Sequence, residues 1–207
     1  NLQRELQFQT ALGPAYCATL GYAAPAVEKA YSRARELCRR LGETPELFPT
    51  LWGSWAYYVV RADLSAARDS ANEMLRIAQA KETDALLLEA HMALGLTYYF
   101  LGQPGDALQH MELALAADSE HRDRSFTFVS GQDAGVCNLA FMGLTLWMLG
   151  RPEEALNRSR EAVALARSLK HPFSLAYALN FASWLRFMLG QPDRAAILAE
   201  EEVTIAE

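Results

Sequence analysis

One pattern occurs three times along this chain, and it restricts the possible fold more than any other feature of the sequence. Residues 94–108, 142–156 and 182–196 each contain a largely apolar segment, a Leu-Gly pair, a polar residue, a proline and then acidic or small residues. Self-similarity at a period of about 40 residues is typical of solenoids, in which each unit buries its apolar face on its neighbours. The repeats therefore predict a binding scaffold rather than an enzyme.

Apolar residues recur at helical spacing almost throughout the chain, without the alternation typical of strands. In each repeat a glycine suits the end of a first helix, and a proline with acidic neighbours suits the first turn of a second helix. We therefore predict an all-α fold, a right-handed α-solenoid of about five antiparallel helix pairs. The paired helices are expected at 2–20 and 25–41, 45–61 and 64–80, 83–101 and 104–117, 132–149 and 152–169, and 172–189 and 192–206.

These pairs divide a single solenoid domain into five units with one irregular insertion. The approximate units are 1–42, 43–82, 83–118, 132–170 and 171–207, and the insertion is 119–131. Pro14 is expected to kink or interrupt the first helix because proline lacks a backbone N–H. Phe126 and Phe128 predict that the insertion packs back on the solenoid. The chain opens at Asn1 and stops inside an expected helix, so we interpret it as a fragment of a longer protein.

Composition and charge argue against several classes of partner. The 207 residues carry a net charge of −6 and no basic stripe, which argues against nucleic-acid binding. The three cysteines are widely spaced, which fits a reducing compartment better than a disulfide framework or a zinc site. No segment is long and apolar enough for a membrane span, and no signal peptide precedes the first helix. We therefore expect a cytoplasmic protein that binds neither nucleic acid nor membrane.

The sequence offers no pattern for catalysis or cofactor binding. The four histidines are scattered, and His91 takes a place that usually holds a core aromatic residue, so we expect it to be a partly buried core histidine. Neither of the glycine-rich motifs that cradle nucleotide phosphates is present. We therefore predict no catalytic residues, no metal ligands and no cofactor.

The unit at 83–118 resembles a tetratricopeptide repeat (TPR). Its landmark residues are Gly95, Tyr98, Gly102, Ala107 and Ala114. The unit at 132–170 repeats the pattern, and the units on either side of these two follow it more loosely. The resemblance implies a TPR-like superhelix, and a period longer than the usual length of about 34 residues implies longer helices.

Nearly the whole chain further resembles the TPR region that lies C-terminal to NTPase modules in large bacterial signalling proteins. The segments 21–31, 131–133 and 171–174 carry this resemblance. In such proteins the solenoid is coupled to nucleotide cyclase, kinase or DNA-binding output domains. The resemblance therefore implies a regulatory module of a bacterial cytoplasmic protein whose catalytic parts lie outside this chain.

In a TPR the first helix of each pair lines the concave face, and this register supplies the candidate partner-binding residues. The face is rich in aromatic residues and methionine, including Phe100 and Met148. The candidates are Trp52, Glu89, Met92, Tyr99, Asp133, Asn138, Trp147, Asn180, Trp184 and Phe187. Such a face is expected to bind a protein or peptide, for example an amphipathic helix or another domain of the parent chain.

Three other interpretations of these residues stay open at this stage. The first is that the long helices are wound so tightly that the aromatic residues pack on each other as core. A tight superhelix with Asp133 and Asn180 inside a closed channel would suit a small-molecule effector. The open ends of the solenoid would also allow self-association, because each end leaves a helix face without a neighbour.

Overall fold

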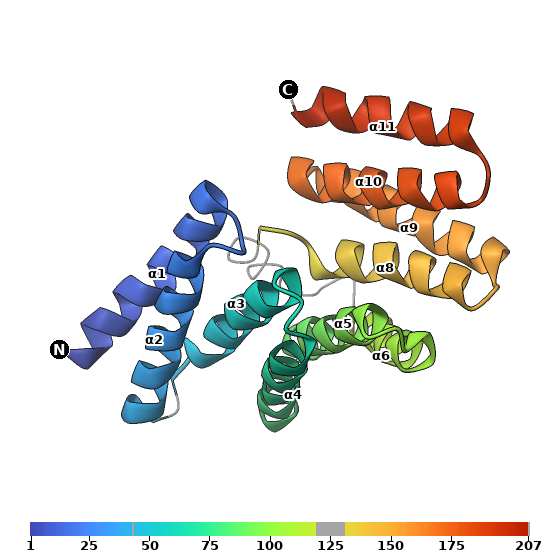
Figure 1. The fold of residues 1–207 in the computed structure, drawn as a ribbon. Helices are drawn as coiled ribbons and strands as arrows, with labels where there is room; N and C mark the ends of the chain where they lie inside the picture. Colours follow the sequence, from blue (N-terminus) through green and yellow to red (C-terminus); the bar gives the residue numbers. More distant parts are fainter. Residues whose placement is uncertain (43, 119–130, 207) are drawn as a thin grey trace.

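A computed structural model describes residues 1–42, 44–118 and 131–206, and these residues form ten α-helices in consecutive antiparallel pairs (Figure 1). The expected all-α solenoid is confirmed. The first helices of the pairs are α1 (Leu2–Leu20), α3 (Leu47–Val60), α5 (Asp84–Phe100), α8 (Ala134–Met148) and α10 (Pro172–Met188). The second helices are α2 (Pro25–Leu41), α4 (Leu64–Lys81), α6 (Pro104–Ala117), α9 (Pro152–Leu169) and α11 (Pro192–Ala206).

Each helix begins and ends within two residues of its predicted boundary. The turns explain this agreement, because Gly102, Gly150 and Gly190 adopt positive φ angles of 70, 73 and 70° that end the first helices. A proline then opens each following helix, where its missing N–H leaves no hydrogen bond unmade. Pro14, in contrast, does not interrupt α1, which continues through it to Leu20. Packing of α1 along α2 holds the helix across that position.

Two predictions about chain organisation are not tested by the fold. Phe126 and Phe128, which were expected to pack back on the solenoid, lie outside the described residues. So does nearly all of the insertion predicted at 119–131. The division into units at the stated boundaries remains a prediction, although each unit contains one helix pair.

Small residues allow the two helices of a pair to approach closely. A Cβ atom added at Gly95 would lie 2.8 Å from Met111 Cγ of α6, and one added at Gly143 would lie 3.2 Å from the Ala155 carbonyl oxygen of α9. In the fifth unit Ser183 replaces the glycine, and its hydroxyl donates to the Ala195 carbonyl at 2.9 Å. These positions therefore share one place in the repeat and fix the register between units.

The first helices α5, α8 and α10 lie side by side, with α8 packed between the other two (Figure 1). In the N-terminal half, α3 touches α5 at only a few points, so the units are joined there mainly through α4. Tyr22, in the turn between α1 and α2, packs against the main hydrophobic core. Burial raises the pKa of Tyr22, and the neighbouring thiols of Cys17 and Cys137 add to the shift. The first unit therefore reaches across to α8.

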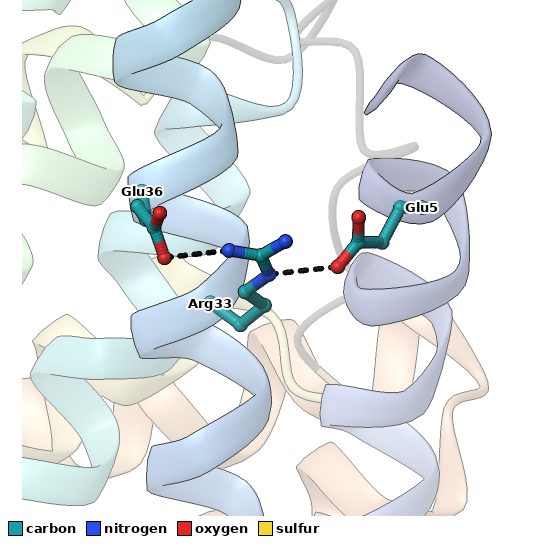
Figure 2. A network of polar contacts seen from close by, with 3 residues as sticks. All are labelled: Glu5, Arg33 and Glu36. Atoms are coloured by element: carbon teal, nitrogen blue, oxygen red, sulfur yellow. Dashed lines mark hydrogen bonds and ion pairs between the residues drawn. The ribbon is translucent and has the colours of Figure 1, made fainter. Parts of the chain in front are cut away.

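An exposed ion-pair network joins α1 to α2 (Figure 2). Arg33 Nε donates to Glu5 Oε1 at 2.7 Å, and a second nitrogen of the same guanidinium donates to Glu36 Oε2 at 2.7 Å. The hydrogen bond from Arg33 lowers the pKa of Glu5. Since both carboxylates are solvent-accessible, this network orients the first helix pair more than it stabilises it.

Candidate partner-binding surface

A ladder of aromatic rings crosses the first helices α5, α8 and α10. Tyr99 and Phe100 of α5 each contact Phe141 of α8, at ring-centroid distances of 5.2 and 5.7 Å. Phe141 packs on Phe181 of α10 at 4.7 Å, and Phe181 contacts Trp184 at 6.1 Å. Edge-on and tilted contacts of this kind are the favourable arrangements of aromatic pairs. The ladder therefore helps to fix the spacing of the three helices.

Exposed apolar side chains gather where the first helices end, and we call this set the aromatic strip. Its members occupy the last two positions of α3, α5, α8 and α10, so they lie in equivalent places in successive units. They are Val60, Phe100, Trp147, Met148 and Phe187, with exposed fractions of 56, 46, 36, 42 and 66%. Because α5, α8 and α10 are adjacent, four of the five form one row. A contiguous exposed apolar row is typical of an interaction surface.

Four of the ten candidates predicted from the sequence lie together at this end of the helices. Trp147, Trp184 and Phe187 are exposed, and Tyr99 is half-buried. Trp184 continues the aromatic ladder, but it lies on the side of α10 that faces away from α8. The accessible part of the predicted surface is therefore limited to a few aromatic side chains.

Three other candidates are buried. Trp52 Nε1 donates to Glu89 Oε2 at 3.0 Å, and both side chains are enclosed between the second and third units. Trp55 makes a parallel bond, from Nε1 to Thr97 Oγ1 at 2.9 Å. Met92 is fully buried in the main core. These residues join neighbouring units, since close winding of the solenoid covers the positions they occupy.

The polar candidates serve helix ends and neighbouring helices. Asp133 is the N-cap of α8, and its backbone N–H donates to Ser174 Oγ at 3.0 Å. Asn138 is fully buried and donates from Nδ2 to a backbone carbonyl of α6 at 2.9 Å. Asn180 is exposed and donates to the Glu202 carboxylate of α11 at 3.3 Å. The three side chains therefore do not converge on one ligand position.

A buried thiol and phenol meet in the interior between α8 and α10. Cys137 Sγ lies 3.1 Å from Tyr177 Oη. Burial raises the pKa of Cys137 to about 12, and it raises the pKa of Tyr177 well above its usual range. Both groups stay protonated at neutral pH, so Cys137 is not an activated nucleophile.

A pair of histidines is the feature of the third unit that was not predicted. His91 Nδ1 of α5 lies 3.0 Å from His110 Nδ1 of α6, and the His110 ring stacks on Tyr98. His91 is partly buried, as expected, and burial together with the charge of His110 lowers its pKa to about 4. The sequence did hold a signal for the pair. Antiparallel packing of Gly95 against the turn that carries Ala107 places residue 91 opposite residue 111, next to His110.

The described residues offer neither a metal centre nor a membrane span. In 1–42, 44–118 and 131–206, no three side chains of His, Cys, Asp or Glu are grouped so as to hold a metal ion. Over the same ranges, each helix is either too short or too polar to cross a bilayer.

Comparison with known proteins relates the chain to TPR-like repeats at the level of the fold. Its structure is similar to a crystal structure of nearly identical kinesin light chain TPR-like repeats from Podosopora anserina, with a TM-score of 0.65 and 14% sequence identity over all of this chain and 96% of that one. A variant of the same repeats gives a TM-score of 0.64 at 15% identity, over 97% of this chain and 93% of that one. The resemblance to a TPR-like fold is thereby confirmed.

Sequence comparison gives one distant relative. No protein-family model matches the chain. An uncharacterized protein of Rhizobium meliloti (strain 1021) is 27% identical over 174 residues, which make up 83% of this chain and 17% of that protein. The chain thus spans a small fraction of the length of this relative.

Proposed function

We propose that this chain is a non-catalytic scaffold that binds a protein or peptide through the aromatic strip. The observation that carries the proposal is the row of exposed apolar side chains across adjacent first helices. Solenoids of helix pairs present extended surfaces of this kind to their partners. Aromatic side chains provide most of the energy in such contacts when a partner excludes water from them.

The partner that best fits the strip is an amphipathic helix. Packed helices lie about 10 Å apart, so the strip spans about 20 Å from α5 to α10. This distance corresponds to about 13 residues of α-helix at a rise of about 1.5 Å per residue. Apolar residues about seven positions apart on a partner helix would each contact one first helix. Met148 at the centre of the strip adapts to the shape of the partner.

In a longer parent protein, this scaffold would regulate an attached NTPase or output domain of a bacterial signalling protein. Two observations support this role: the resemblance of segments 21–31, 131–133 and 171–174 to such regulators, and the much greater length of the Rhizobium meliloti relative. An amphipathic helix of the same parent chain is then the natural partner of the strip.

Peptide display tests the proposal while the natural partner is still unidentified. Random peptides selected on the wild-type chain would be measured against the double variant Trp147→Glu, Phe187→Glu. We expect binding to weaken at least about tenfold, because charges then replace two anchors of the strip. Leu113→Glu is the matched control, since Leu113 is 45% exposed on α6 outside the strip.

The controls separate lost binding from lost folding. Circular dichroism would verify that both variants keep the helical content of the wild type, as expected for exposed positions. Selected peptides that bind the double variant as tightly as the wild type would contradict the proposal. A selection that enriches no peptide on the folded wild-type chain would also contradict it.

A further inference from the structure

The outer face of α1 is exposed although the same positions are buried in later units. Gly13, Gly95 and Gly143 each back onto the second helix of their own unit, and Ser183 takes that place in the fifth. In this register the pair Phe8 and Leu12 corresponds to Ala90 and Leu94, to Asn138 and Met142, and to Ala178 and Ala182. The later residues are at most 5% exposed, whereas Phe8 is 61% and Leu12 is 37% exposed.

The opposite end of the solenoid shows the complementary gap. Trp184 of α10 is 53% exposed, whereas Leu144 at the corresponding place in α8 is 1% exposed. Val203 of α11 is 58% exposed, whereas Val163 at the corresponding place in α9 is 8% exposed. The C-terminal unit therefore presents the surface on which each inner unit receives its successor.

The interior of the solenoid shows what covers such a surface. Between the fourth and fifth units, Ala178 and Ala182 of α10 form one packed cluster with Ala140 of α8 and with Ala162 and Val163 of α9. In the repeat register, Phe8 and Leu12 are the counterparts of the two alanines, and Val203 is the counterpart of Val163. The two open ends are thus the two halves of one interface that the chain already forms internally.

A groove on the N-terminal face has room for the second helix of a preceding unit. It runs between α1 and α2, has a volume of about 570 Å³, and is lined in part by Gln9, Leu12, Lys29 and Arg33. Inside the solenoid each second helix packs against the next first helix in the same way. The helix that would enter this groove is α11.

The charges of the two ends are complementary. Residues 1–42 carry six Lys or Arg and three Asp or Glu, whereas residues 171–206 carry two and four. Three of the acidic residues are consecutive on α11, at 200–202. Lys29 in the groove and Asn180–Glu202 on the opposite end supply polar partners for each other at the centre of the contact. Opposite charges favour this pairing over contact between two like ends.

We propose that copies of this chain associate head to tail, with α1 and α2 of one copy docked on α10 and α11 of the next. The contact repeats the internal interface between units and so continues the superhelix from one copy into the other. Such an interface is heterologous and does not close on itself, so association continues beyond a dimer as concentration rises. The proposal does not depend on the aromatic strip, since none of Phe8, Leu12 and Val203 belongs to it.

Sedimentation equilibrium of end-blocked variants tests the proposal. The wild-type mass is expected to rise above that of a dimer of 23.0 kDa chains over a roughly hundredfold range of concentration. Phe8→Glu blocks the N-terminal face and Val203→Glu blocks the C-terminal face, so each variant alone should stay at 23.0 kDa. An equimolar mixture should form a dimer and stop there, because each variant keeps one intact end. Leu113→Glu, on the outer surface of α6, should associate like the wild type.

Each other outcome overturns the proposal. A wild-type chain that stays at 23.0 kDa would show that second copies do not cover these faces. Dimers of Phe8→Glu alone would indicate contact between two like C-terminal ends. A mixture of the two blocked variants that remains monomeric would exclude the head-to-tail arrangement. Circular dichroism of each variant keeps a folding defect from being mistaken for lost association.

Discussion

The substitution Gly53→Ala is expected to weaken the junction between the first and second units. Tyr31 of α2 is buried, and its ring lies against both Gly13 of α1 and Gly53 of α3. A Cβ atom added at Gly53 would fall on the Tyr31 ring, closer than any real carbon–carbon contact. The ring cannot retreat toward Gly13, because a Cβ there would also collide with it. Tyr31 must therefore leave its position or push the helices apart.

The size of the effect follows from opposing contributions. Displacing or straining a buried aromatic ring costs about 3–4 kcal/mol. Replacing glycine by alanine inside a helix returns up to about 1 kcal/mol. The net loss in free energy of unfolding is therefore about 2–3 kcal/mol. Gly105→Ala is the matched control, because Gly105 lies in α6 with no atom within 4 Å of its added Cβ and should gain about 0.5–1 kcal/mol.

Urea unfolding followed by circular dichroism and by tryptophan fluorescence would measure both variants, since Trp52 and Trp55 report on the second unit. The background variant Tyr31→Ala removes the ring, and Gly53→Ala should then cost nothing further. Wild-type stability of Gly53→Ala, beside the expected gain for Gly105→Ala, would refute the argument that Tyr31 is held between two glycines. An undiminished loss in the Tyr31→Ala background would refute it equally.

Two further predictions concern titratable groups. The pKa of His91 falls from 6.5 to about 4 on folding, so its contribution to stability is present above pH 6.5 and is lost as the pH falls toward 4. Allowing for partial solvent screening, we expect a loss of about 1–2 kcal/mol, which His91→Gln should abolish in urea titrations at several pH values. Equal pH dependence in both proteins would contradict this. Maleimide labelling followed by mass spectrometry should modify the half-buried Cys17 in the native state and Cys137 only after unfolding, and equal labelling rates would contradict the burial of Cys137.

The helices were predictable because their ends depend on local chemistry. Gly102 and Pro104, and the matching residues of the next two units, mark the turns by backbone geometry that no distant contact needs to supply. Pro14 shows the limit of such reasoning, since packing against α2 preserves a helix that proline alone disfavours. Where a local preference met a tertiary contact, the contact decided the structure.

The accessible surface was less predictable, because it depends on the angle between units. The TPR register places Met92 and Trp147 on the same concave face, yet Met92 is fully buried and Trp147 is 36% exposed. The difference arises from the approach of α5, α8 and α10, which is set by side-chain packing such as that of Phe141 on Phe181. Repeat register alone does not contain that angle. It assigns a residue to a face but not the depth at which the next helix covers it.

Head-to-tail association and partner binding would combine without merging into one continuous surface. In the register fixed by the glycines, Cys17 and Ala18 of α1 take the places that Trp147 and Met148 hold in α8. Small side chains there interrupt the apolar row at the first unit of every copy. Each copy then offers a separate strip, and the strips recur at a regular interval along the assembly. A partner with several amphipathic helices would gain affinity from their effective concentration, although the contacts made by each helix stay the same.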